Sequence, residues 1–159
     1  MYKSNFTKTL RYNLTKWFDA WKAVLKIIVF IGADDMSAIQ TGGCLCGKTR
    51  YAISGKSEFT LQCYCRDCQQ ISGSGNLPLY VVKRSDFEIT GRVKEHRRKS
   101  DSGNDLTLSF CGECGSPICN VNSRLADKVF VIAGSLDDPS IFTVESKIYE
   151  ASRQPWDES

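Results

Sequence analysis

The sequence predicts a mostly β fold in which antiparallel sheets are pinned together by metal ions. Three observations support this class: short runs of β-forming residues, turn-forming clusters between them, and cysteines in closely spaced groups. The runs cover residues 48–54, 59–63, 77–82, 87–90, 93–98, 106–110 and 128–133. Clusters of Gly, Ser, Asn and Asp at residues 72–76 and 100–105 are typical of turns, and residues 66–71 suit one turn of helix. Seven short strands in about 110 residues indicate a mostly antiparallel β domain.

Length and composition suit an ordinary globular domain rather than a disordered chain. The 159 residues are 42% hydrophobic and 25% charged, which allows a sizeable core. The first 35 residues hold six of the 21 Lys and Arg residues against three Asp, so the remainder carries 15 basic and 15 acidic residues. A neutral domain has no electrostatic footprint for phosphates, and we expect no nucleic-acid partner.

Residues 1–35 differ from the rest and predict an amphipathic helix. Its apolar face consists of Leu10, Leu14, Trp17, Phe18, Trp21, Val24, Leu25 and Ile28. Lys22 and Lys26 interrupt the apolar run, which excludes a membrane span and argues against a signal peptide. The helix could pack on the domain or on a second copy, could be an extension outside the functional unit, or, least favoured, could contact a membrane surface. We therefore divide the chain into a helical extension, residues 1–35, and a domain, residues 36–159.

The eight cysteines carry the chemistry that the sequence predicts. Seven of them form C-x-C, C-x-C-x2-C and C-x2-C groups, namely Cys44 and Cys46, then Cys63, Cys65 and Cys68, then Cys111 and Cys114. A disulfide framework is the alternative, but this spacing is typical of metal ligands, and no convincing secretion signal precedes it. We therefore expect a protein of the reducing cytoplasm.

These groups supply sulfurs for two zinc sites of different kinds. The two outer pairs together supply four sulfurs, which would complete a tetrahedral structural site, close a long loop and contribute to folding. The central group supplies three, which would leave the fourth position open for water or a substrate sulfur. Cys119 could complete that second site, or it could be a small buried hydrophobic residue, as its strand-like surroundings favour. His96 lies among charged residues and is interpreted as a solvated side chain.

Four motifs that follow one another along the chain resemble those of a known family. They are Gly42-Gly43-Cys44-Leu45-Cys46-Gly47 with Arg50-Tyr51, Cys63-Tyr64-Cys65-Arg66-Asp67-Cys68 with Ser72-Gly73, Phe110-Cys111-Gly112-Glu113-Cys114-Gly115-Ser116-Pro117, and the tail Gly134-Ser135-Leu136-Asp137-Asp138-Pro139. Together they resemble the glutathione-dependent formaldehyde-activating enzyme (GFA) family, which is grouped with centromere protein V-like proteins. The resemblance covers about residues 40–157 and leaves the N-terminal helix unexplained.

The resemblance implies a β-tent, a tent-like fold of antiparallel sheets held by two zinc ions. It implies that the structural ion is bound by Cys44, Cys46, Cys111 and Cys114, and the catalytic ion by Cys63, Cys65 and Cys68. It also implies a carbon–sulfur lyase that condenses glutathione with formaldehyde to S-hydroxymethylglutathione, so its partners would be a small thiol and a small aldehyde. Three thiolates weaken the Lewis acidity of zinc, so we favour capture and orientation of the thiol over activation of the carbonyl.

The sequence departs from the family pattern at three positions while keeping every sulfur. Tyr64 and Lys147 stand where the family often has His, and Gln69 stands where Arg is common. Arg50, Arg66 and Lys147 are the candidates for binding the carboxylates of glutathione. The alternative function is a non-catalytic zinc-binding module that mediates protein interaction, because a shared scaffold does not fix a reaction.

Overall fold

Ten strands and one short α-helix make up most of the regular structure in the residues that the computed structural model describes, 39–100 and 103–157. The predicted helix over residues 1–35 and the predicted boundary at residue 36 lie outside the described residues. The mostly β class is confirmed, with one difference from the expected antiparallel pairing: the edge strand β10 (Ser146–Ile148) runs parallel to its neighbour. No described helix is long and apolar enough to cross a membrane.

The smaller sheet has three antiparallel strands in the order β1-β2-β5. These are β1 (Gln40–Gly43), β2 (Thr49–Ile53) and β5 (Phe87–Gly91). Side chains alternate along β2, so that Thr49, Tyr51 and Ile53 are buried while Arg50 is exposed. The sequence analysis did not predict β1, which pairs with β2 along its whole length.

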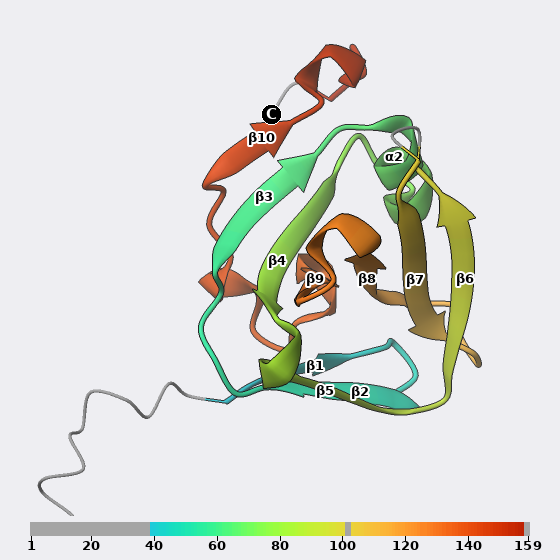
Figure 1. The fold of residues 1–159 in the computed structure, drawn as a ribbon, viewed down its shortest axis with the longest axis vertical. Coiled ribbons are helices and arrows are strands. Elements are labelled where there is room, and N and C mark those ends of the chain that lie inside the picture. The colour runs from blue at the N-terminus through green and yellow to red at the C-terminus, as the bar shows by residue number, and fades with distance from the viewer. Residues whose placement is uncertain (1–38, 101–102, 158–159) are drawn as a thin grey trace, which may run out of the picture. The chain divides into compact units, whose positions relative to one another are not determined.

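The larger sheet has seven strands in the order β10-β3-β4-β9-β8-β7-β6. Besides β10, they are β3 (Phe59–Cys63), β4 (Leu77–Lys83), β6 (Val93–Lys99), β7 (Asp105–Cys111), β8 (Pro117–Asn122) and β9 (Lys128–Ile132). Figure 1 shows the sheet curving strongly, with β10, β3 and β4 on one side of the view and β7 and β6 on the other. The smaller sheet lies below it in this view.

Short helical segments join the strands. They are α2 (Arg66–Ser72) and the 3₁₀ turns η1 (Arg84–Asp86), η2 (Ser123–Leu125), η3 (Ala133–Ser135), η4 (Pro139–Ile141) and η5 (Glu150–Ser152). The segment that follows η3 links the two sheets, because Leu136 forms a bridge with Gly42 of β1. The amide of Asp137 also donates to the carbonyl of Thr41 at 2.9 Å.

Strand β4 contributes to two hydrophobic cores because its side chains alternate between the faces of the larger sheet. Tyr80 and Val82 pack in the core between the two sheets, together with Tyr51 of β2. Leu79 and Val81 pack in a second core, with the residues of β3. Each fully buried side chain of this size stabilises the fold by roughly 1.5–3 kcal/mol. The two cysteine sites described below border different cores.

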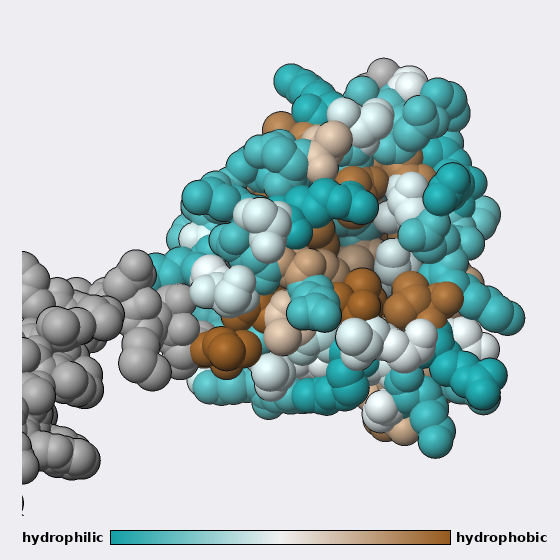
Figure 2. Space-filling view, turned by 60° about the horizontal axis from the view of Figure 1, so that its bottom comes forward, coloured by the Kyte–Doolittle hydropathy of each residue, from teal (hydrophilic) through white to brown (hydrophobic). Residues whose placement is uncertain are grey.

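The two edges of the larger sheet differ in length and charge. β10 has only three residues, all of them exposed. β6, at the other edge, is mostly exposed and carries Lys94, Glu95, His96, Arg97, Arg98 and Lys99. Figure 2 shows that some hydrophobic residues also reach the surface of one face, in small areas surrounded by hydrophilic residues.

Candidate metal centres

Four cysteines from two distant segments meet at one end of the core between the sheets. Cys44 and Cys46 lie in the turn between β1 and β2, Cys111 ends β7, and Cys114 lies in the turn to β8. Their sulfurs lie within 4.8 Å of one another, with 3.5 Å between Cys44 and Cys46 and 3.8 Å between Cys46 and Cys111. These separations are far longer than a disulfide bond of about 2.05 Å, and all eight cysteines are free. We call this group the four-cysteine site.

Two similar turns direct these sulfurs toward one another. In the first, the amide of Cys44 donates to the carbonyl of Thr49 at 3.0 Å, and the amide of Gly47 donates to the carbonyl of Cys44 at 3.1 Å. The second turn repeats this pattern from Cys111, with Gly115 in the place of Gly47. Gly47 and Gly115 have φ values of 73° and 75°, a left-handed conformation that favours glycine. The local sequence therefore builds each pair of ligands.

Polar groups beside Cys44 and Cys114 favour the thiolate forms of these two cysteines, whereas burial and the neighbouring cysteines raise the pKa of Cys46 to about 12. The amide of Thr49 donates to the sulfur of Cys44 at 3.2 Å. The hydroxyl of Ser116 lies 3.2 Å from the sulfur of Cys114, and hydrogen bonds from the hydroxyl and amide of Ser116 lower the pKa of Cys114 to about 5. Thiolates are the form in which cysteines bind metals, so this site could hold a metal ion.

Three further cysteines meet within one short stretch at the end of β3. Cys63 ends β3, Cys65 precedes the first residue of α2, and Cys68 lies in the first turn of that helix. Their sulfurs lie within 4.8 Å of one another, with 3.4 Å between Cys63 and Cys65. Cys63 is buried at the second core, whereas Cys65 and Cys68 are partly exposed. We call this group the three-cysteine site.

The thiols of the three-cysteine site cannot all lose their protons without a cation. Hydrogen bonds from Cys63 and Cys68 lower the pKa of Cys65 to about 2. The same crowding raises the pKa of Cys63 to about 11, through its hydrogen bond with Cys65, and also raises the pKa of Cys68. The surroundings therefore favour the thiolate form of Cys65 and oppose that of Cys63 and Cys68, and a positive ion between the sulfurs would favour all three. Three sulfur donors fit a soft divalent metal ion.

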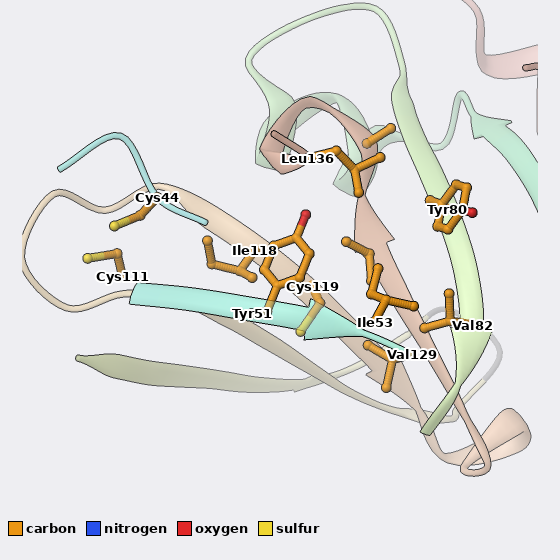
Figure 3. Packing of buried hydrophobic residues seen from close by; sticks show 12 residues of the cluster. Cys44, Tyr51, Ile53, Tyr80, Val82, Cys111, Ile118, Cys119, Val129 and Leu136 are labelled. Atoms are coloured by element: carbon orange, nitrogen blue, oxygen red, sulfur yellow. The ribbon is translucent and has the colours of Figure 1, made fainter. Parts of the chain in front are cut away.

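Cys119 does not complete the three-cysteine site. It lies on β8, is 3% exposed and packs in the core between the sheets, where burial raises its pKa to about 11. Figure 3 shows it beside Tyr51 and apart from Cys44 and Cys111, while Cys63 packs in the other core. The interpretation of Cys119 as a small buried hydrophobic residue is confirmed. His96 is exposed on β6, as expected for a solvated side chain.

A cavity of about 470 Å³ lies close to both sites. Cys44 and Leu45 line it from the four-cysteine site, and Ser72 lines it from the end of α2. Leu77, also in its lining, is the cross-strand partner of Cys63. The sulfurs of the three-cysteine site are not among the lining residues, so the cavity lies next to that site rather than over it.

The wall of this cavity contains an ion pair between Arg50 and Asp137. Both Nη atoms of Arg50 donate to the carboxylate of Asp137, and the hydroxyl of Thr41 donates to the same carboxylate at 2.6 Å. These donors, Arg50 first, hold the pKa of Asp137 below its ordinary range. Arg50 is therefore engaged by the chain itself. Of the other two candidates for carboxylate binding, Arg66 is exposed and donates to Gln69 at 3.2 Å, and Lys147 is exposed.

Two residues within or beside the central motif are buried to an extent that the sequence does not reveal. Tyr64 is 0% exposed and Gln69 is 3% exposed. Segments about 80 residues away in the chain bury them, so the local sequence gives no signal of their environment.

Comparisons with known proteins agree with this architecture. The family model described as glutathione-dependent formaldehyde-activating enzyme matches residues 39–152. A crystal structure of a Rhodobacter sphaeroides protein superposes with a TM-score of 0.50 at 15% sequence identity, over 67% of this chain and 98% of that chain. At that identity the likeness concerns the fold alone. No curated protein matches the sequence.

Proposed function

Because the chain belongs to the glutathione-dependent formaldehyde-activating enzyme family, we propose that it is a zinc-dependent enzyme of the carbon–sulfur lyase type. The proposed reaction joins a small thiol to a small aldehyde, as when glutathione and formaldehyde give S-hydroxymethylglutathione. The observation that carries this proposal is the three-cysteine site, which has three sulfurs and no fourth protein ligand among the described residues. An open fourth position is what distinguishes catalytic from structural zinc sites.

The proposal assigns two zinc ions to the chain. The structural ion would be held by Cys44, Cys46, Cys111 and Cys114, and the catalytic ion by Cys63, Cys65 and Cys68. When bound at the second site, zinc would lower the pKa of an added thiol, so that the thiol would be a thiolate at neutral pH. The chain itself holds the three sulfurs at fixed spacing, and the partial exposure of Cys65 and Cys68 leaves an approach from solvent. Cysteines that bind metal must stay reduced, and for this reason we propose the cytoplasm as the compartment.

The cavity next to Leu77 is proposed to receive the part of the thiol substrate that does not react. Its volume of about 470 Å³ lies within the range of about 300–1,000 Å³ that is usual for small-molecule sites. The pairing of Arg50 with Asp137 leaves its wall without net charge. A substrate carboxylate would therefore bind the exposed Arg66 or Lys147, or would have to displace Asp137 from Arg50.

The experiment that tests this proposal combines zinc content with turnover. The zinc content of the purified full chain is measured, and formaldehyde consumption is followed with glutathione and a panel of other small thiols. We expect two zinc ions per chain and consumption well above the uncatalysed rate with at least one thiol. The Cys65→Ala variant should lose one zinc ion and the activity, because the remaining two sulfurs cannot hold the ion.

Cys119→Ala serves as the matched control, because it removes a cysteine that lies outside both sites. It should keep both zinc ions and the activity. Loss of both zinc ions in Cys65→Ala, or of neither, would contradict two independent sites. A wild-type protein that binds two zinc ions but accelerates formaldehyde consumption with no thiol would refute the proposed reaction.

A further inference from the structure

Gln69 occupies an unusual position directly after the last ligand of the three-cysteine site. Its side chain is 3% exposed, and every hydrogen-bonding group of its amide is used. Nε2 donates to the carbonyl of Tyr64 at 2.8 Å and to the carbonyl of Ser152 at 2.9 Å. Oε1 accepts from Nε2 of Gln154 at 3.1 Å and from Nη1 of Arg66 at 3.2 Å. A buried amide with four partners holds each of them in place.

One of these partners is the backbone of the residue that links two metal-ligand candidates. Tyr64 lies between Cys63 and Cys65, and its carbonyl accepts the hydrogen bond from Gln69. Its amide donates to the carbonyl of Ile148 in β10 at 3.0 Å. The backbone amide and the backbone carbonyl of Tyr64 are therefore both fixed by hydrogen bonds. Rotation of the Tyr64 backbone would move the two neighbouring sulfurs.

Two other partners, Ser152 and Gln154, belong to the C-terminal segment, which runs past the end of β3 in Figure 1. The pairing of β10 with β3 places Ile148 opposite Cys63. Farther along, the guanidinium of Arg153 lies over the ring of Tyr64, 5.6 Å from its centre. Nδ2 of Asn76 donates to the carboxylate of Asp157 at 3.2 Å, which fixes the end of the segment to the loop after α2. Residues 146–157 thus contact the ligand-bearing turn at several points.

We propose that Gln69 is a positioning residue that, with the C-terminal segment 146–157, sets how tightly the three-cysteine site binds its metal ion. This inference rests on the proposed function, because it takes the three-cysteine site to be a metal site. The four-cysteine site has its own hydrogen bonds, from Thr49 and Ser116, and none to Gln69 or this segment is among the contacts of the described residues. The effect of Gln69 is therefore confined to one of the two sites.

The expected size of the effect on metal affinity follows from what residues that orient metal ligands generally contribute. Residues that orient ligands by hydrogen bonds typically change metal affinity about 10- to 100-fold when they are replaced. Gln69→Met keeps the volume of the side chain but removes both donors and the acceptor. It leaves the carbonyls of Tyr64 and Ser152 without their buried partner, so the turn between Cys63 and Cys65 loses its fixed orientation.

The test is a cobalt(II) titration of the full chain after its metal has been removed. Binding is monitored by the sulfur-to-cobalt charge-transfer absorption, and the titration is repeated against a competing chelator. We expect the wild-type protein to bind two ions. Gln69→Met should bind one of them about 10- to 100-fold more weakly and the other as in the wild type. Gln70→Met is the matched control, because Gln70 is the next residue of α2 and is exposed, and its two affinities should not change.

A second variant keeps the inference testable where Gln69→Met fails to fold. Gln154→Leu removes only one of the four partners of Gln69, so it should weaken the same site by a smaller factor. Two unchanged affinities in both variants, or equal weakening of both sites, would overturn the positioning role. A wild-type chain that binds only one ion would overturn both this inference and the proposed function. A chain that binds two ions, responds as expected to Gln69→Met and yet acts on no thiol would refute the proposed function alone.

Discussion

The two cysteine sites differ in the origin of their sulfurs, and this difference predicts different roles. The four-cysteine site joins turns that belong to different sheets, with Cys46 and Cys111 65 residues apart in the chain. The three-cysteine site takes all its sulfurs from six consecutive residues, Cys63 to Cys68. A metal ion at the first site links segments that the backbone leaves separate. A metal ion at the second links residues that are already neighbours, so the fold does not depend on it.

The largest effect should follow from Cys111→Ala, which removes a buried ligand of the four-cysteine site. Metal binding contributes up to about 10–16 kcal/mol to folding in small zinc fingers, comparable to the whole stability of about 5–15 kcal/mol of a typical domain. We expect Cys111→Ala to be largely unfolded at room temperature. Circular dichroism and thermal unfolding would show the loss directly.

Cys65→Ala provides the matched comparison, since it removes one ligand of the local site. It should retain the β-sheet spectrum and unfold within several degrees of the wild type, because only about 1–2 kcal/mol of local interactions is lost. Similar losses of stability in the two variants would mean that both sites support the fold. The distinction drawn from their positions in the chain would then be wrong.

A smaller, pH-dependent effect should come from Tyr51, which packs in the core that the four-cysteine site borders. Burial raises its pKa to about 12 from an ordinary value of 10.0, so between these values the folded protein keeps a proton that the unfolded chain loses. The contribution of Tyr51 is therefore complete below pH 10 and declines as the pH rises toward 12. Relative to Tyr51→Phe, the wild type should lose about 1 kcal/mol of unfolding free energy near pH 11, measured in urea.

The exposed Tyr149 offers the control for this measurement, because Tyr149→Phe removes a hydroxyl that is not buried. That variant should follow the pH dependence of the wild type. A constant difference between the wild type and Tyr51→Phe from pH 7 to pH 11 would show that burial of the Tyr51 hydroxyl does not shift its titration. The core beside the four-cysteine site would then be more open to water than the structure indicates.

The smallest effect concerns the ion pair between Asp67, inside the three-cysteine motif, and Arg98 of β6, which are about one-third exposed. Asp67→Asn should lower the unfolding free energy by no more than about 1 kcal/mol, because partly exposed ion pairs contribute little. Glu95→Gln, which breaks the more exposed pair with Arg97, is the control and should have a smaller effect still. Urea unfolding measures both. A loss of several kcal/mol in Asp67→Asn would show that the three-cysteine stretch supports the fold.

The sequence predicted the parts of this molecule that depend on local spacing. The groupings of Cys44 with Cys46 and of Cys63 with Cys65 and Cys68 follow from turns only a few residues long, and the polarity pattern located most of the strands. β1, β8 and β10 carry weak patterns, because short strands are defined by the neighbours with which they pair. The environment of Gln69 could not be predicted, since two of its four hydrogen bonds, those with Ser152 and Gln154, depend on how distant parts of the chain meet.

The edges of the larger sheet have a consequence for how copies of the chain behave at high concentration. An unpaired strand edge is a template on which another chain can add a strand and start aggregation. A second copy approaching along β6 would have to strip water from charged side chains, because five of its seven residues are charged. At the opposite edge, β10 exposes only three residues, too few to hold a foreign strand. The sheet can therefore stay open at both ends without recruiting further chains.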